Sequence, residues 1–346
     1  MKIGSARKAA AEWVTKHASQ EAGFRGAYFS GSTVGLPDDA ELSAASDIDV
    51  VIVTAQDEAP PKLGKFIYRD TLIEVTYLSW SQLASVEEVL TSYPLAGSFR
   101  VDTIMADPTG HLRRLQAEVS RRFAEPEWVR RRCENARQKM ENGLRTIDPS
   151  APLHDRVTAW LFPTGVTTHV LLVAALSNPT VRLRYLAARK VLMEYGHDHL
   201  YADLIRLLGC THLTPQRVQH HLDGLAHTFD AASAVAKTPF LFSSDITAAA
   251  RPIAIDGSRE LIEAGYHHEA VFWMVATYAR CHKILAADAP DLQRTHSPAF
   301  HAVLTDIGIH SASDLLSRAE EVNRFLPKLW ETTEAILSAN PDIQAN

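Results

Sequence analysis

Two aspartates separated by one residue stand at the start of an apolar run, in the segment Ser46–Val53. The run is typical of a β-strand, and side chains alternate between the faces of a strand, so Asp47 and Asp49 point to the same face. Two carboxylates at this spacing repel each other unless a cation lies between them, and oxygen ligands of this kind suit Mg²⁺. The pair therefore indicates a magnesium site. The plainer alternative is two solvated residues at the entry to a strand.

A third carboxylate, Glu74, interrupts the otherwise apolar strand pattern of Leu72–Tyr77. A buried, unpaired carboxylate is costly, so Glu74 needs a cationic partner or a metal. If this strand lies beside the aspartate strand, Glu74 completes a cluster of three carboxylates. In the alternative, Glu74 faces water on an edge strand and pairs with Lys65 or Arg69. The hairpin-like Tyr68–Thr71 supports adjacent strands but does not settle which face Glu74 takes.

A Gly-Ser pair, Gly31-Ser32, follows the expected strand Gly26–Ser30. At the end of a strand, such a pair lets backbone N–H groups and a hydroxyl approach phosphate oxygens, because no bulky side chain stands in the way. Gly-Ser is also a common turn sequence, so by itself the pair indicates only a change of chain direction.

In this order, the three features resemble the DNA polymerase β-like nucleotidyltransferase superfamily, whose signature is Gly-Ser, then Asp-x-Asp, then an acidic residue on a neighbouring strand. The arrangement is similar to that of bacterial antibiotic nucleotidyltransferases, including the streptomycin/spectinomycin, kanamycin and lincosamide enzymes. The resemblance covers about residues 26–78, and beyond them it concerns architecture only. The chain departs from the pattern in the loop Thr33–Ser46, which is longer than expected and could form a mobile flap.

The resemblance implies a metal-dependent transfer of a nucleoside monophosphate, AMP from ATP, to a hydroxyl of a small molecule such as an aminoglycoside-like antibiotic. It implies that Asp47 and Asp49 bind two Mg²⁺ ions. It also implies that Glu74 is either a third metal ligand or the general base, and that Gly31 and Ser32 contact the β- and γ-phosphates of the NTP.

The pattern of expected strands and helices predicts an α+β fold. It consists of a small mixed-sheet nucleotidyltransferase domain over residues 1–108, followed by an all-α helical bundle over residues 109–346. The first part alternates short β-rich runs with turns, and one helix is expected at each of Ser5–Ser19 and Ser79–Leu90. The expected strands are 26–30, 49–53, 65–68, 72–77 and 101–105. After Pro108 the apolar residues recur at helical spacing, with prolines near several predicted helix starts.

The helical part is expected to bind the acceptor and to supply cations to the triphosphate. Its best candidates are Arg182, Arg189 and Lys190, which lie in one predicted helix, Val181–Tyr195. Arg182 and Arg189 are seven residues apart and would share a helix face. A solvated basic face explains the same residues without any ligand. Glu269, in a later helix, is a weaker candidate for lining an acceptor pocket.

Composition narrows the function classes. Hydrophobic residues make up 46% of the 346 residues, an ordinary share for a globular protein. The net charge of -6 argues against nucleic acid as the partner and favours a cationic acceptor. The three cysteines form no pair at close spacing, and no signal peptide or membrane span is expected, so the predicted location is the cytoplasm.

Two other functions remain open: nucleotidylation of a protein or RNA, as in toxin–antitoxin systems, and a non-catalytic helical interaction protein with a relic domain.

Overall fold

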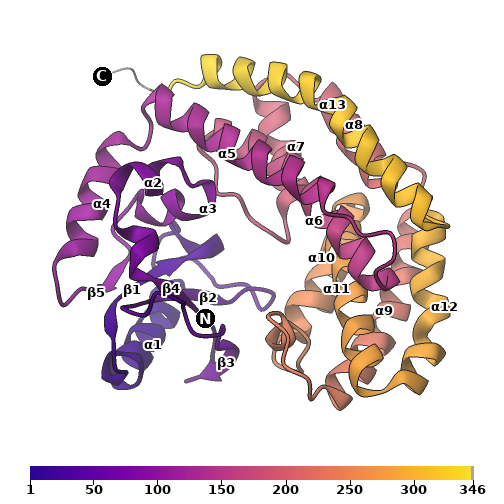
Figure 1. Ribbon diagram of the computed structural model, residues 1–346, viewed down its shortest axis with the longest axis horizontal. Helices are drawn as coiled ribbons and strands as arrows, with labels where there is room; N and C mark the ends of the chain where they lie inside the picture. The colour runs from indigo at the N-terminus through magenta and orange to yellow at the C-terminus, as the bar shows by residue number, and fades with distance from the viewer. Residues whose placement is uncertain (344–346) are drawn as a thin grey trace. The chain divides into compact units, whose positions relative to one another are not determined.

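The computed structural model describes residues 1–343, which form two compact units (Figure 1). The first comprises Met1–Arg132 together with Asp342 and Ile343 near the C-terminus, and it is an α+β unit. The second comprises Cys133–Pro341 and is helical. The mixed sheet followed by helices confirms the expected α+β class.

The first unit is built on a five-stranded sheet with the strand order β3-β4-β2-β1-β5. The strands are β1 (Phe24–Ser30), β2 (Ile48–Thr54), β3 (Gly64–Tyr68), β4 (Thr71–Ser79) and β5 (Ile104–Ala106). Strands β2 and β4 run parallel, whereas the other neighbouring pairs are antiparallel. The strand that carries Glu74 thus lies directly beside the strand that carries Asp49.

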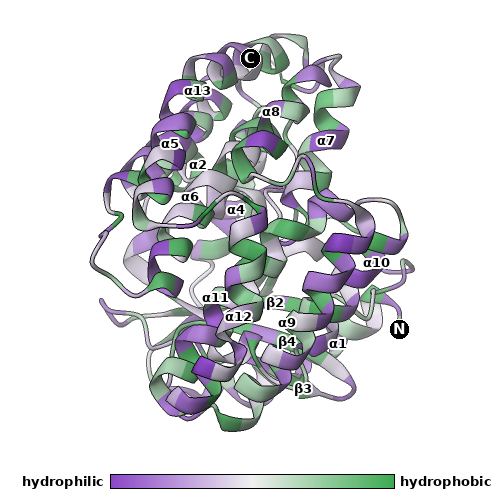
Figure 2. Cartoon of the chain, turned by 90° about the vertical axis from the view of Figure 1, so that its right-hand side faces the viewer, coloured by the Kyte–Doolittle hydropathy of each residue, from purple (hydrophilic) through white to green (hydrophobic). Residues whose placement is uncertain are grey.

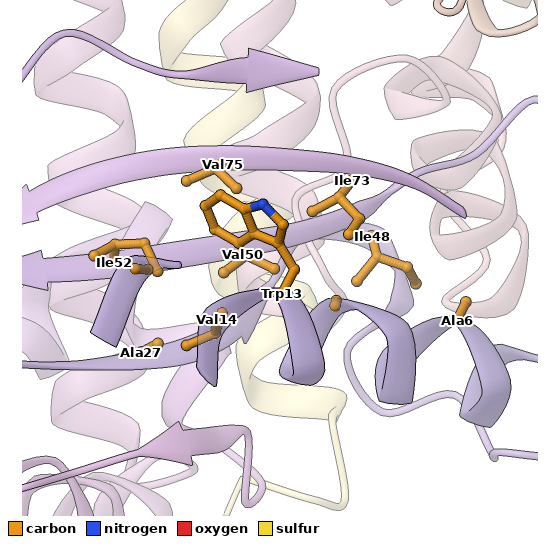
Figure 3. Packing of buried hydrophobic residues seen from close by; sticks show 11 residues of the cluster. Ala6, Trp13, Val14, Ala27, Ile48, Val50, Ile52, Ile73 and Val75 are labelled. Carbon is orange, nitrogen blue, oxygen red and sulfur yellow. The ribbon is translucent and has the colours of Figure 1, made fainter. Parts of the chain in front are cut away.

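Helix α1 (Ile3–Lys16) packs on one face of this sheet and buries Trp13 and Val14 there (Figure 3). The strand residues in this core are Ala27, Ile48, Val50, Ile52, Ile73 and Val75. Those of β2 and β4 occupy alternate positions, and together with Ala27 of β1 they form the apolar face that α1 covers. Since strand side chains alternate, Asp49 and Glu74 lie on the opposite face of the sheet.

Helical segments lie on both sides of β5 in the chain. Before it come η3 (Trp80–Leu83), α2 (Val86–Thr91), α3 (Tyr93–Ala96) and η4 (Gly97–Phe99), and after it comes α4 (His111–Arg122). The single helix expected over 79–90 is wrong. Ser79 does cap a helical turn, but the turn is the short η3. The Ser85 hydroxyl then accepts a hydrogen bond from the Glu88 N–H and starts α2 separately. Two capping side chains so close together favour two short segments over one helix.

The first compact unit extends past residue 108, the expected domain boundary, to Arg132. It does so because α4 and the start of α5 (Pro126–Arg145) pack with it. The Arg132 guanidinium is buried and donates hydrogen bonds to the carbonyls of Leu90 and Phe123, at 3.1 and 2.5 Å. A buried guanidinium needs such acceptors, so these bonds tie the start of α5 to α2 and to the end of α4.

The second unit is formed by the rest of α5 and by the helices that follow. These are α6 (Leu153–Ala174), α7 (Arg184–Glu194), α8 (His199–Leu208), α9 (Pro215–Val235), α10 (Gly257–Glu263), α11 (His267–Asp288), α12 (Pro290–Asp306) and α13 (Ala312–Ala339), with a π-helical turn, η6, at Pro252–Asp256. Helix α6 packs against α7, α11 and α13. It is long and apolar enough to cross a membrane, but 72% of its most apolar window is buried, as in the core helix of a bundle.

Helix α13 illustrates how the outer helices of this unit are made. Figure 2 shows hydrophilic and hydrophobic residues along it. Its buried residues recur every three or four positions, as in Leu315, Ala319, Val322, Phe325 and Leu329. That spacing gives α13 one apolar stripe for packing.

Candidate active site

The acidic residues singled out from the sequence converge on the face of the sheet opposite α1. Asp49 and Glu74 are direct partners in the parallel β2–β4 register, and Asp47 lies two residues before Asp49. Each of the three carboxylates offers an oxygen, and these oxygens lie within 4.8 Å of one another. The adjacent strands thus bring the three acids together.

The register extends this cluster into a row across four strands. Ser30 of β1 lies opposite Asp49, Asp49 lies beside Glu74, and Lys65 of β3 lies opposite Glu74. Directly opposed residues in neighbouring strands are about 5 Å apart and share a face. The sheet therefore presents a hydroxyl, two carboxylates and an ammonium group in sequence.

Gly31 leaves β1 immediately after this row, with a φ of +72°, and begins the short turn Gly31–Thr33 that includes Ser32. A Cβ atom at this position would lie 1.7 Å from Asp49 Oδ2 and 2.4 Å from Asp49 Cγ. Only glycine adopts this conformation without strain and leaves room for the carboxylate. The backbone after β1 therefore lies directly against the carboxylate of Asp49.

Two lysines balance the charge of the carboxylates. The Lys65 ammonium lies 2.6 Å from Glu74 Oε1 and 3.3 Å from Asp47 Oδ2, and its side chain is only 8% exposed. Lys62, just before β3, contacts the same Glu74 oxygen. The alternative that paired Glu74 with Lys65 is confirmed for the partner. Its placement of Glu74 in water on an edge strand is wrong, because the Glu74 side chain is only 13% exposed and lies within the cluster.

The pKa values of the acids follow from burial and from these neighbours. Burial raises the pKa of Asp47, and burial together with the charges of Asp47 and Glu74 raises the pKa of Asp49 well above its ordinary value. Burial alone would also raise the pKa of Glu74, but Lys65 and Lys62 outweigh it and lower this pKa to about 2. A hydrogen bond between Asp49 and Glu74 further raises the pKa of Asp49 and lowers that of Glu74.

The donor set fits a hard divalent cation. All three groups offer carboxylate oxygens, the ligands that Mg²⁺ prefers, and they are close enough to share one ion. Burial, and after it repulsion from the charges of Asp47 and Glu74, favour the protonated form of Asp49 and raise its pKa. A cation held by Asp47 and Asp49 would relieve that repulsion.

The loop Thr33–Ser46, expected to be a mobile flap, is anchored to the start of α1. The Arg7 guanidinium donates hydrogen bonds to the Thr33 carbonyl at 2.6 Å and to Asp38 Oδ1 at 2.7 Å. The backbone N–H groups of Ile3 and Gly4 donate to carbonyls of the loop, both at 2.9 Å. The extra length of the loop thus reaches α1, and Arg7 fixes the end of the turn that follows Gly31.

The basic residues proposed for the triphosphate lie in the second unit. Arg182 is not in the predicted helix, because α7 begins at Arg184; it lies in the preceding turn and donates a hydrogen bond to the Gly257 carbonyl at 3.3 Å. The expected shared helix face of Arg182 and Arg189 is therefore wrong. The helix starts where Arg184 is buried beside the ring of Phe272, 4.1 Å from its centroid.

Arg189 is in α7, and its guanidinium lies 2.8 Å from the nearly buried carboxylate of Glu269. The rings of Tyr201 and Tyr266 also lie near this guanidinium, with centroids 5.4 and 5.5 Å from its central carbon. Lys190, the next residue, is exposed. Glu269 thus has a structural partner, and of the three basic candidates Lys190 is the most exposed to solvent.

Lys65 is the site residue whose role the sequence left undecided, although its position is encoded locally. Arg69 and Asp70, with φ values of 47° and 60°, form a two-residue turn that pairs Tyr68 with Thr71. Counting outward from such a turn places Lys65 opposite Glu74. The hairpin register was therefore a signal that could have identified the pair.

No protein-family model matches this chain and no curated protein matches it, so the functional argument rests on the residues and geometry of the site.

Proposed function

We propose that the first unit is a nucleotidyltransferase that transfers AMP from ATP to a hydroxyl group, using a divalent cation held by Asp47 and Asp49. The observation that carries the proposal is the convergence of Asp47, Asp49 and Glu74 on one sheet face, directly beside the Gly31 turn. This combination supports the resemblance to the polymerase β-like superfamily, because its residues, their order and their strand pairing all agree with that pattern.

In the proposed reaction, the acceptor oxygen attacks the α-phosphorus of ATP, the bond to the bridging oxygen breaks, and pyrophosphate leaves. Asp47 and Asp49 hold Mg²⁺, which when bound supplies positive charge next to the triphosphate. Gly31 and Ser32 provide a turn where backbone N–H groups can approach the β- and γ-phosphates. Glu74 either adds an oxygen ligand or accepts the proton of the acceptor hydroxyl.

The proposed acceptor is a small molecule with a hydroxyl and positive charge, as in an aminoglycoside-like antibiotic, and the proposed setting is the cytoplasm. The net charge of -6 supports a cationic acceptor and disfavours nucleic acid. In this proposal the helical unit binds the acceptor and contributes cations to the triphosphate, with Arg182, Arg189 and Lys190 as candidates. Lys190 is the first of these to test, since it is exposed.

The test is transfer of label from [α-³²P]ATP with Mg²⁺ and a panel of hydroxyl-bearing amines. Asp49→Asn should abolish transfer while the circular dichroism spectrum is retained. Asp57→Asn, a matched change at an exposed aspartate, should leave transfer intact. Label on a protein or on RNA instead would replace the small-molecule acceptor with a macromolecular one. Absence of ATP binding in the presence of Mg²⁺ would contradict the whole proposal.

A further inference from the structure

The ammonium group of Lys65 lies inside the carboxylate cluster. It contacts two of the three acids, Glu74 at 2.6 Å and Asp47 at 3.3 Å. Its side chain is more buried than either of these carboxylates, whose exposed fractions are 13% and 14%. Lys65 is therefore part of the carboxylate cluster itself and not a residue at its solvent-exposed border.

The backbone fixes this position. Lys65 and Glu74 are directly opposed across the antiparallel β3–β4 pair, and Asp49 follows Glu74 in the parallel β2–β4 pair. The ammonium group therefore approaches the cluster from the side of Glu74, while Gly31 contacts Asp49 at the other end of the row. Lys62 reinforces the arrangement, since it contacts the same oxygen of Glu74.

Charge and space then limit how many divalent cations the cluster holds. A cation bridging Asp47 and Glu74 would lie where Lys65 already contacts both side chains, and its charge would repel two nearby ammonium groups. A cation on Asp47 and Asp49 meets less repulsion from the lysines, because Glu74 is the acid that both of them contact. The two possible cation positions are therefore unequal.

We propose that the site holds one divalent cation, on Asp47 and Asp49, and that Lys65 supplies the second positive charge by holding Glu74 in place. The inference rests on the proposed function and replaces the pair of Mg²⁺ ions that the family resemblance implies with one ion and one ammonium group. Lys65 is then a positioning residue, and Lys62 assists it.

The test counts Mn²⁺ ions by electron paramagnetic resonance, with one equivalent of α,β-methylene-ATP per chain. The wild-type protein should bind one Mn²⁺ per chain. Lys65→Met, which keeps the length of the side chain and removes its charge, should bind two, and Lys65→Arg, which keeps the charge, should bind one. Lys8→Met, a charge removal at an exposed lysine of α1, should match the wild type.

Two Mn²⁺ ions on the wild-type protein would overturn the inference, whether or not the Lys65 variants fold. An unchanged count of one in a folded Lys65→Met would also overturn it, because the lysine would then exclude no ion. These failures differ from failure of the proposed function. A wild type that binds two ions and still transfers AMP contradicts only the role of Lys65, whereas a wild type that binds no Mn²⁺ with the analogue contradicts both proposals.

Discussion

Replacing Gly31 with alanine tests whether the turn after β1 leaves the room that the metal site needs. The new Cβ atom would lie 1.7 Å from Asp49 Oδ2, and heavy atoms do not approach this closely, so the carboxylate or the turn must move by about 1 Å or more. Metal ligation tolerates displacements of only about 0.2 Å. We therefore expect Gly31→Ala to weaken Mn²⁺ binding by at least about 100-fold, the upper range seen when neighbours that merely orient ligands are lost.

The same substitution also carries a conformational cost, and the assay has to separate the two effects. An L-residue at a φ of +72° costs roughly 1–2 kcal/mol. Gly35→Ala is the matched control, because Gly35 has a φ of +82° with no atom within 4 Å of an added Cβ. It should lose similar stability in urea unfolding and keep wild-type Mn²⁺ affinity. Wild-type affinity in Gly31→Ala, or an equal loss in Gly35→Ala, would refute the steric argument.

Three further predictions concern stability. Burial lowers the pKa values of His169 and His282 from 6.5 to about 3 and about 4, so below pH 6.5 the unfolded state takes up protons that the folded state refuses. As the pH is lowered from 6.5 toward these folded-state pKa values, each histidine should therefore reduce the free energy of unfolding by up to about 1.4 kcal/mol per pH unit. Urea titrations at pH 7.5 and 5.5 measure this loss. Arg7→Ala removes both hydrogen bonds to the 33–46 loop and should expose that loop to limited proteolysis. Arg189→Ala leaves the carboxylate of Glu269 buried without its cation and should lower Tm by several degrees, more than Lys190→Ala does.

The parts of the site that the sequence predicted are those set by local geometry. Alternation along a strand places Asp47 and Asp49 on one face whatever the rest of the chain does. The turn at Gly31 follows from the same kind of local signal. The start of α7 was not predicted correctly. The helix begins at Arg184, whose guanidinium packs against Phe272, a residue far away in the sequence that local patterns do not report.

The side of the sheet that Glu74 takes is a long-range property. In isolation, the strand around it could place its carboxylate on either face, and the apolar residues Ile73 and Val75 decide only that they and Glu74 lie on opposite faces. Helix α1 settles the question, because Trp13 packs against the face that carries Val75. The alternation in each strand could be read from the sequence, but only the parallel β2–β4 pairing places Asp49 and Glu74 on the same face.

The row of charges also depends on register, and this makes the hairpin between β3 and β4 part of the candidate site. The turn at Arg69 and Asp70 sets Lys65 against Glu74. A slip of one residue in β3 would turn Lys65 to the face covered by α1, where its charge would meet an apolar core, and would bring an apolar neighbour toward the acids. The slip is unfavourable on both faces, because it would bury the Lys65 ammonium beneath α1 and would take this cation away from the carboxylates on the other face. The chemistry proposed for Lys65 and the stability of the β3–β4 register therefore depend on the same pair of residues.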